Sequence, residues 1–141
     1  MPLEIYPNEH RVALTPQNTG LLLKKGFSRV LVERSAGVQA QFLDDQYRAA
    51  GAILVDRDEV LKSSDILLKV RPPLFGREVE HMKDGATLIS FLYPNQNKEV
   101  VNALAQKKAT AFAMEMIPRI SRAQVFDALR YVSRMRKRVS L

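Results

Sequence analysis

The chain has 141 residues, a net charge of +7 at pH 7 and no cysteine. An apolar fraction of 46% is enough to build the core of one ordinary domain, so a disordered chain is not expected. Without cysteine, disulfides and thiolate metal sites are excluded, and only His10 and His81 remain as imidazole ligands, so no metal site is expected. No apolar run approaches the ~20 residues of a membrane span, which favours a soluble chain.

The positive charge is concentrated near the carboxyl end of the sequence. Residues 130–138 carry five arginine and lysine side chains and no acidic one, so 7 − 5 leaves a charge of only +2 on the remainder. At helical spacing, residues 130–141 place basic side chains opposite an apolar face, which predicts a divergent basic amphipathic tail. The domain before it, residues 1–129, is nearly neutral, and no nucleic-acid partner is expected.

The first predicted element is a helix over residues 15–26. Thr15 is the expected N-cap and Pro16 occupies the first helical position, where its missing N–H is tolerated. Lys24 and Lys25 lie in the last turn, and Gly26 ends the helix. Both ends of this helix are therefore marked in the sequence.

Short apolar segments then alternate with helix-like segments along the chain. The apolar segments predict five strands, at residues 29–33, 52–55, 65–70, 86–91 and 110–114. The intervening helices are expected at residues 44–51, 57–64 and 97–108. This alternation predicts an α/β fold with an open, doubly wound, mainly parallel sheet in three layers, as in Rossmann and flavodoxin-like proteins.

Such sheets often bind nucleotides through a glycine-rich loop between a strand and a helix. The six glycines of this chain are spread out and never form even the pattern G-x-G. The dinucleotide fingerprint and the Walker loop are therefore both lacking.

Five segments, taken in order, carry a family resemblance. They are IYPNEHRVALTP at 5–16, FLDDQYRAAGA at 42–52, ILLKVRPP at 66–73, ATLISFLYPNQN at 86–97 and MIPRISRAQVFDAL at 116–129. Together they resemble the N-terminal half-domain of the alanine dehydrogenase and pyridine nucleotide transhydrogenase family. The last two segments are most similar to the alpha subunit of the transhydrogenase branch.

The resemblance implies a two-lobed NAD(H)-binding component in which this lobe faces a nucleotide-gripping Rossmann lobe across a cleft. It also implies that Arg119, Gln124 and Asp127 bind the cofactor by contacting the nicotinamide end of NAD(H). From the residues alone, the same cluster has a structural interpretation. Ser121 and Gln124 have capping-box spacing, and Asp127 can pair with Arg130.

Three further positions are candidates to face the cleft: Arg11, Lys69 and Tyr93. In the alanine dehydrogenase branch, the positions of Arg11 and Lys69 bind pyruvate, although both cations could equally be ordinary surface charges. That branch has a catalytic histidine where this sequence has Tyr93, and a phenol with a pKa near 10 is a poor proton shuttle at neutral pH. No catalytic residue is assigned, and amino-acid dehydrogenation is disfavoured.

The sequence also departs from the family. The family begins with a strand before the segment that contains Leu3 and Glu4, and this strand is expected to be missing here. Ser35 stands where the family favours glycine, which could strain a turn. After Leu129 the expected small-residue helix is replaced by the basic tail, in which Arg130 takes the place of a nucleotide-binding serine.

The leading hypothesis is therefore a truncated piece of a proton-translocating transhydrogenase subunit, inactive alone and binding NAD(H) weakly or not at all. The second lobe, the NADP(H)-binding component and the membrane domain would be its partners. The family implies a peripheral position on such a membrane complex, at the bacterial cytoplasmic face or the mitochondrial matrix side. Two alternatives stay open: a non-catalytic module that associates with itself, as a homodimer for example, and an alanine dehydrogenase relative.

Overall fold

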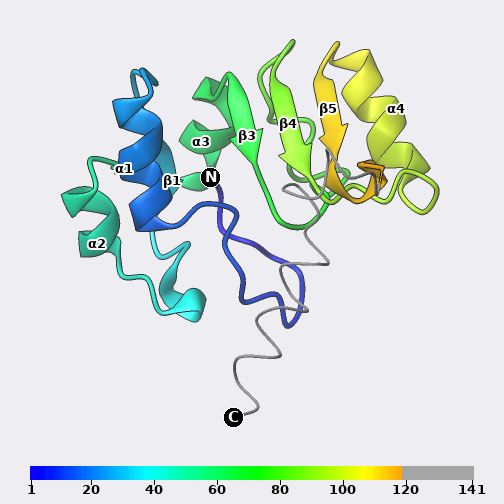
Figure 1. Ribbon diagram of the computed structural model, residues 1–141. Helices are drawn as coiled ribbons and strands as arrows, with labels where there is room; N and C mark the ends of the chain where they lie inside the picture. Colours follow the sequence, from blue (N-terminus) through cyan, green and yellow to red (C-terminus); the bar gives the residue numbers. More distant parts are fainter. Residues whose placement is uncertain (119–141) are drawn as a thin grey trace.

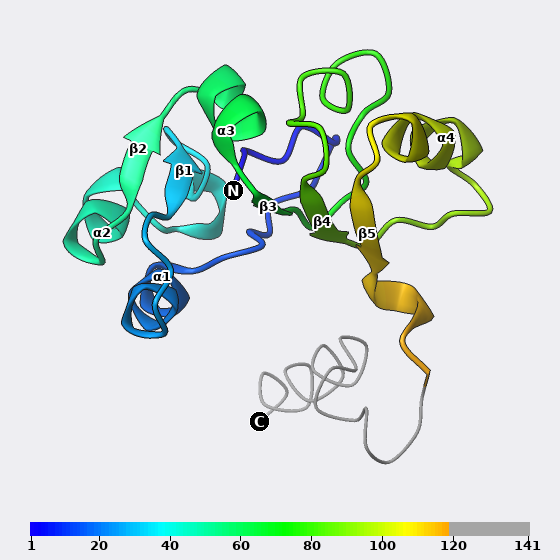
Figure 2. The same ribbon diagram turned by 90° about the horizontal axis from the view of Figure 1, so that it is seen from above.

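The computed structural model describes residues 1–118, which form five short parallel strands with helices on both sides (Figures 1 and 2). The strands are β1 (Leu31–Glu33), β2 (Ile53–Val55), β3 (Ile66–Leu68), β4 (Thr87–Ser90) and β5 (Thr110–Ala113). β1 pairs with β2, and β4 pairs with both β3 and β5. All of these pairings are parallel.

The four α-helices are α1 (Pro16–Lys24), α2 (Asp44–Ala49), α3 (Arg57–Ser63) and α4 (Lys98–Gln106), with short 3-10 turns η1 (Val38–Ala40) and η2 (Met114–Met116). Of the four α-helices, α1 and α3 begin with a capping side chain, whereas α2 and α4 have no side-chain cap. Thr15 caps α1 by accepting from the N–H of Asn18 at 3.3 Å, and Asp56 caps α3 by accepting from Glu59 at 3.0 Å. Figure 2 shows α1 on one side of the strands and α3 and α4 on the other.

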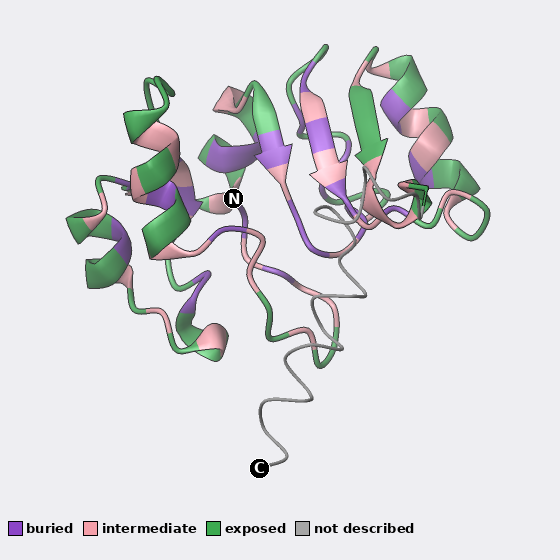
Figure 3. Ribbon diagram, viewed as in Figure 1, coloured by how far each residue is buried: buried purple, intermediate pink, exposed green. Residues whose placement is uncertain are grey.

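Two apolar clusters form the core. One lies between α3, α4 and the strands β3 and β4, with Leu61, Leu67 and Leu88 at its centre. The other lies between α1, α2 and β1, where Val32 and Tyr47 are completely buried. Figure 3 shows this burial on the inner strands and the inner sides of the helices, whereas β5 at the edge is largely exposed.

These findings confirm the predicted fold class, and each strand and helix predicted within residues 1–118 is present within its expected range. One feature differs from a single open sheet. The strands form two separate ladders, one of two strands and one of three, because β1 and β3 do not pair with each other. The chain start lies in the space between them (Figure 2).

Residues 71–86 contain no helix or strand, yet they contribute to the core. Val79 and Met82 are buried in the cluster under α3 and α4, and Glu78 has no exposed surface. Among residues 1–118, no helix is long and apolar enough to cross a membrane.

Candidate functional site

A cavity of about 310 Å³ opens at the carboxyl ends of the strands β3, β4 and β5. Ligands of open parallel sheets bind at this end, so we treat it as the candidate site and name it the carboxyl-edge cavity. Its lining consists of Arg11, Val12, Ala13, Leu68, Lys69, Val70, Ile89, Phe91 and Met114. The walls are thus mainly apolar, with Arg11 as the exposed cation.

Arg11 is held at the cavity by Glu9. The guanidinium donates from Nε and from an Nη atom to the two carboxylate oxygens of Glu9, each at 2.7 Å. This bidentate contact lowers the pKa of the Glu9 carboxyl and raises that of Arg11. The Arg11 side chain is still 57% exposed, so it retains donors for an anionic or carbonyl group of a ligand.

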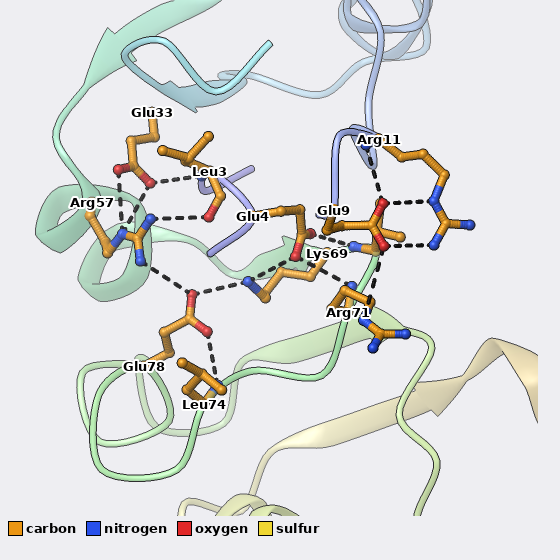
Figure 4. A network of polar contacts seen from close by, with 11 residues as sticks. Leu3, Glu4, Glu9, Arg11, Glu33, Arg57, Lys69, Arg71, Leu74 and Glu78 are labelled. Atoms are coloured by element: carbon orange, nitrogen blue, oxygen red, sulfur yellow. Dashed lines mark hydrogen bonds and ion pairs between the residues drawn. The ribbon is translucent and has the colours of Figure 1, made fainter. Parts of the chain in front are cut away.

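Arg71 lies on the other side of Glu9, at 3.9 Å from its carboxylate. Its guanidinium carbon lies 4.9 Å from the centre of the Tyr6 ring, which is cation–π distance. Glu9 therefore faces two arginines, one from the segment after it and one from the loop after β3 (Figure 4). The contacts fix the position of residues 6–11 against the end of β3.

Lys69 also belongs to the lining, but its side chain has no exposed surface. Its ammonium lies 3.0 Å from Glu78 and 3.3 Å from Glu4 (Figure 4). The interpretation of Lys69 as an ordinary surface charge is therefore wrong, because two buried carboxylates enclose it. Its ammonium supports the floor of the cavity, and Arg11 remains the accessible cation of the pair.

The ion pairs continue toward α3, where the side chains of Arg57 and Glu33 are partly exposed, at 25% and 13%. Arg57 on α3 contacts Glu33 at 3.2 Å and Glu78 at 3.8 Å, and it donates to the carbonyl of Leu3 at 3.0 Å. The carboxylates also accept backbone N–H groups, Val70 to Glu4 at 2.6 Å and Leu74 to Glu78 at 2.8 Å. We call Glu4, Glu33, Arg57, Lys69 and Glu78 the buried ion network.

Tyr93 lies just beyond β4, at a strained point of the backbone. Its φ angle is 48°, in the left-handed region that non-glycine residues seldom adopt. Glu115 holds this turn by accepting the N–H groups of Leu92 and Tyr93, at 2.9 and 2.5 Å. The Tyr93 ring stacks on Phe91 of the cavity lining, and the residue is 37% exposed. The stacking on Phe91 places the Tyr93 phenol near the rim of the cavity.

The three predicted cofactor-binding residues, Arg119, Gln124 and Asp127, lie outside the described residues, as does the predicted tail 130–141. Their assignment therefore stays a prediction. The described chain ends at Pro118, two residues after η2, which continues directly from β5. Met114, at the start of η2, is part of the cavity lining.

The sequence reasoning missed most of the residues that organise this site. Glu4, Glu9, Glu78 and Arg57 were not singled out, because carboxylates and arginines usually lie in solvent. A weak signal existed for Glu4, which stands in the mainly apolar segment MPLEI. The partners of Lys69 are 65 and 9 residues away in the chain, so no local pattern connects them.

The site suits one part of a dinucleotide better than another. An exposed guanidinium beside apolar walls and the Phe91 ring can accept a flat ring that carries a carboxamide. The strand-to-helix turns of residues 1–118 offer no glycine-rich loop for phosphates. Within residues 1–118, the lining is thus compatible with a flat ring of this kind.

Comparison with known proteins agrees with this architecture. The family model described as the alanine dehydrogenase/PNT N-terminal domain matches residues 1–136. The NAD(P) transhydrogenase subunit alpha of Haemophilus influenzae is 44% identical over 129 residues, covering 92% of this chain and 25% of the relative. The alanine dehydrogenase of Staphylococcus saprophyticus is 33% identical over 117 residues, covering 83% of this chain and 31% of the relative.

A solved structure gives the same result in three dimensions. The crystal structure of a transhydrogenase from Sinorhizobium meliloti superposes with a TM-score of 0.84 at 38% identity, over 91% of this chain and 36% of the other. The chain thus spans about a quarter to a third of the length of these relatives. The chain belongs to the alanine dehydrogenase/pyridine nucleotide transhydrogenase N-terminal domain family, and it is more similar to the transhydrogenase alpha subunit of Haemophilus influenzae than to the alanine dehydrogenase of Staphylococcus saprophyticus.

Proposed function

We propose that this chain is the first lobe of a transhydrogenase NAD(H)-binding component, in which the carboxyl-edge cavity and the segment after Pro118 position the nicotinamide ring for hydride exchange with NADP(H). The observation that carries the proposal is the 44% identity to a transhydrogenase alpha subunit over 92% of the chain. Hydride transfer requires two rings in close register and no protein acid or base. The absence of a catalytic acid or base from the assigned residues is consistent with this.

In the bound state, Arg11 and the apolar wall of the cavity would have different roles. Arg11, oriented by Glu9, donates hydrogen bonds to the carboxamide or ribose oxygens at the rim of the cavity. The apolar wall that includes Phe91 and Met114 keeps water from the ring. NAD(H) supplies the hydride when it is bound. Arg119, Gln124 and Asp127 follow Pro118 in the chain and are proposed to complete the contacts.

Because the phosphate-binding loop is assigned to a second lobe, the chain alone is proposed to be inactive and to bind NAD poorly. We expect a dissociation constant of about 1 mM or weaker, equivalent to about 4 kcal/mol. Isothermal calorimetry of the isolated chain with NAD measures it directly. A micromolar dissociation constant would show that this lobe grips the whole dinucleotide by itself.

The role of the segment after Pro118 is tested in a completed protein, which we define as this chain joined to the second lobe of the Haemophilus influenzae relative and supplied with an NADP(H)-binding component. Arg119→Ala is expected to slow hydride exchange by at least ~10-fold, since a lost charge-assisted hydrogen bond is worth about 1.5–3 kcal/mol. Asp127→Asn, which keeps the shape and removes the charge, should also slow it. Gln124→Ala is less clean, because it also removes the capping-box partner of Ser121.

The structural interpretation of the same residues gives the opposite result. Under it, all three variants lose up to ~1 kcal/mol of stability and keep the full rate once folded. Thermal unfolding of the same variants distinguishes the helix-capping interpretation from the cofactor-binding one. Loss of stability without loss of rate would assign the cluster to helix capping.

The alternative activity, alanine dehydrogenation, is favoured by the similarity to alanine dehydrogenases, such as the 33% identity to that of Staphylococcus saprophyticus. The exposed phenol of Tyr93 argues against it, because a phenol does not exchange protons readily at neutral pH. Alanine-dependent reduction of NAD by the completed protein would support this alternative. The same assay on Tyr93→His would show whether one imidazole at this position is sufficient to confer the activity.

A further inference from the structure

Tyr93 has a backbone conformation that its own sequence disfavours. Its φ angle of 48° lies in the left-handed region, which a bulky residue rarely adopts. The next residue is Pro94, and a residue before proline favours extended backbone instead. Strained backbone of this kind persists only where surrounding contacts hold it, and it clusters at ligand-binding sites. The contacts that hold Tyr93 therefore bear on what the residue does.

Two side chains bind all the backbone polar groups of Leu92 and Tyr93. Glu115, in η2, accepts the two N–H groups at 2.9 and 2.5 Å. Asn97, just before α4, donates from Nδ2 to the two carbonyl oxygens at 2.9 and 3.2 Å. We call these four residues the Tyr93 clamp. The clamp satisfies backbone groups that lie outside any helix or strand.

The clamp joins two walls of the carboxyl-edge cavity. Phe91 and Met114 both line the cavity, Phe91 just after β4 and Met114 just after β5. Tyr93 lies two residues beyond Phe91, and Glu115 follows Met114 directly. The bonds from Leu92 and Tyr93 to Glu115 therefore fix the end of β4 relative to the end of β5. Movement of this turn would displace the rim of the cavity.

The clamp also places the Tyr93 phenol near Arg11, the exposed cation of the cavity. The pKa of Arg11 is raised mainly by its hydrogen bond to Glu9, and Tyr93 makes a smaller electrostatic contribution. The phenol thus lies within electrostatic range of the guanidinium, on a ring that stacks on Phe91. Tyr93 is 37% exposed, so a bound molecule can reach it. A phenol O–H donates to carbonyl oxygens, as do the N–H groups of Arg11.

We propose that Tyr93 is a further ligand-contacting residue of the carboxyl-edge cavity and that Glu115 is its positioning residue. The phenol donates a hydrogen bond to a carbonyl oxygen on a flat ring in the cavity, and the clamp holds the phenol where this bond can form. The inference rests on the proposed function, which identifies the ring as nicotinamide and the carbonyl as that of its carboxamide. Tyr93 then orients the ring and exchanges no proton, and orientation is the main requirement of hydride transfer.

The positioning role is tested on the full 141-residue chain without any ligand. Glu115→Gln keeps the size of the side chain but leaves one acceptor oxygen for two N–H groups. By NMR, Tyr93 should change from positive φ to the extended backbone that Pro94 favours, and amide exchange at Leu92 and Tyr93 should be at least ~10-fold faster. Glu99→Gln is the matched control. Glu99 is exposed in the first turn of α4, so its substitution should leave both signals unchanged.

The ligand contact is tested in the completed protein with NADH. Tyr93→Phe removes only the hydroxyl and should lower kcat for hydride exchange by about threefold to tenfold, as expected for one neutral hydrogen bond. The KM for NADH should change by less than about twofold, because the diphosphate is assigned to the second lobe. Glu115→Gln should lower kcat at least as much. The double variant should be no slower than Glu115→Gln alone, since both changes act on one hydroxyl, and Glu99→Gln should leave kcat unchanged.

A nicotinamide titration separates failure of this inference from failure of the proposed function. Free nicotinamide is added to the full chain at up to ~50 mM, a range suited to the weak binding of so small a ligand, and the ring resonances of Phe91 and Tyr93 are followed by NMR. We expect these resonances to shift in the wild-type chain and to stay largely unshifted in Glu115→Gln. Such shifts beside a completed protein that exchanges no hydride would contradict the proposed function and support the inference.

Three results would overturn the inference. The first is a φ angle and an amide exchange rate of Tyr93 that do not change in Glu115→Gln. The second is a Tyr93→Phe protein with the wild-type kcat, or a Glu115→Gln protein that loses stability and keeps its rate once folded. The third is a wild-type chain whose Phe91 and Tyr93 rings do not respond to nicotinamide.

Discussion

Lys69 joins three segments of the chain at the site end of the sheet. Its ammonium is enclosed by Glu4 and Glu78, and these carboxylates in turn accept the N–H groups of Val70 and Leu74. The chain start, the end of β3 and the loop after it are thus joined at one charge. A buried ion pair contributes little net stability, but removal of one member leaves the others uncompensated.

Substitution of Lys69 tests this arrangement. Lys69→Ala should lower the free energy of unfolding by about 3–5 kcal/mol, because Glu4 and Glu78 would remain buried without their cation. Lys62→Ala is the matched control, since Lys62 pairs with Asp58 on the exposed face of α3. Urea unfolding of both variants compares them. Equal effects of the two substitutions would contradict the description of the network as buried and coupled.

Met1 gives a pH dependence with a definite sign. Its α-ammonium has a pKa of about 5 in the folded chain against 8.0 in a free chain end, mainly because of burial. Between these values the unfolded chain binds the proton and the folded chain does not, so stability should rise from pH 5 to pH 8 by a few kcal/mol. Nα-acetylation removes the titrating group. The difference in Tm between free and acetylated chains should therefore shrink as pH rises, and a constant difference would exclude this origin.

At the scale of elements, a turn between a strand and a helix shows where the backbone is strained. Ser35, in the turn between β1 and η1, has a φ angle of 63°, a conformation that suits glycine. The family resemblance predicts strain in this turn, because the family favours glycine at the position of Ser35. The positive φ angle confirms that prediction. The Ser35 N–H donates to Asp44 at 2.8 Å, a contact that any residue can make. The strain is thus local and separable from the rest of the fold.

Ser35→Gly should therefore stabilise the protein by about 0.5–1 kcal/mol, because relief of the left-handed conformation exceeds the added freedom of the unfolded chain. Ser28→Gly serves as the control, since Ser28 is exposed and is not among the residues with positive φ. The control should lose stability. If Ser35→Gly also lost stability, the turn would not be strained.

At the scale of the whole molecule, the sequence predicted the elements well and their long-range contacts poorly. Apolar runs of fixed length and capping residues such as Thr15 are local, and they located the five strands and four α-helices of residues 1–118, but not the 3-10 turns η1 and η2. The alternation of strand and helix segments correctly indicated a doubly wound sheet. The separation into two ladders could not be predicted from periodicity, because periodicity locates strands but does not show which strands pair with each other.

The candidate site was predictable to a smaller extent. Arg11 and Lys69 are both predicted to face one cleft, and both line the carboxyl-edge cavity. Their different roles were not predictable, because burial of Lys69 depends on carboxylates that are distant in the chain. The edge strand β5 is largely exposed, with Phe112 at 54% exposure.

The central claim is that this lobe belongs to a hydride-exchanging NAD(H) component. The most direct measurement is the rate of hydride exchange between NADH and an NADP analogue by the completed protein, compared with the same second lobe joined to the first lobe of the Haemophilus influenzae relative. We expect a rate within about tenfold of the reference, a difference of about 1.4 kcal/mol in the barrier, and no alanine-dependent reduction of NAD. A folded, NAD-binding completed protein that shows no hydride exchange, or that oxidises alanine, would contradict the account.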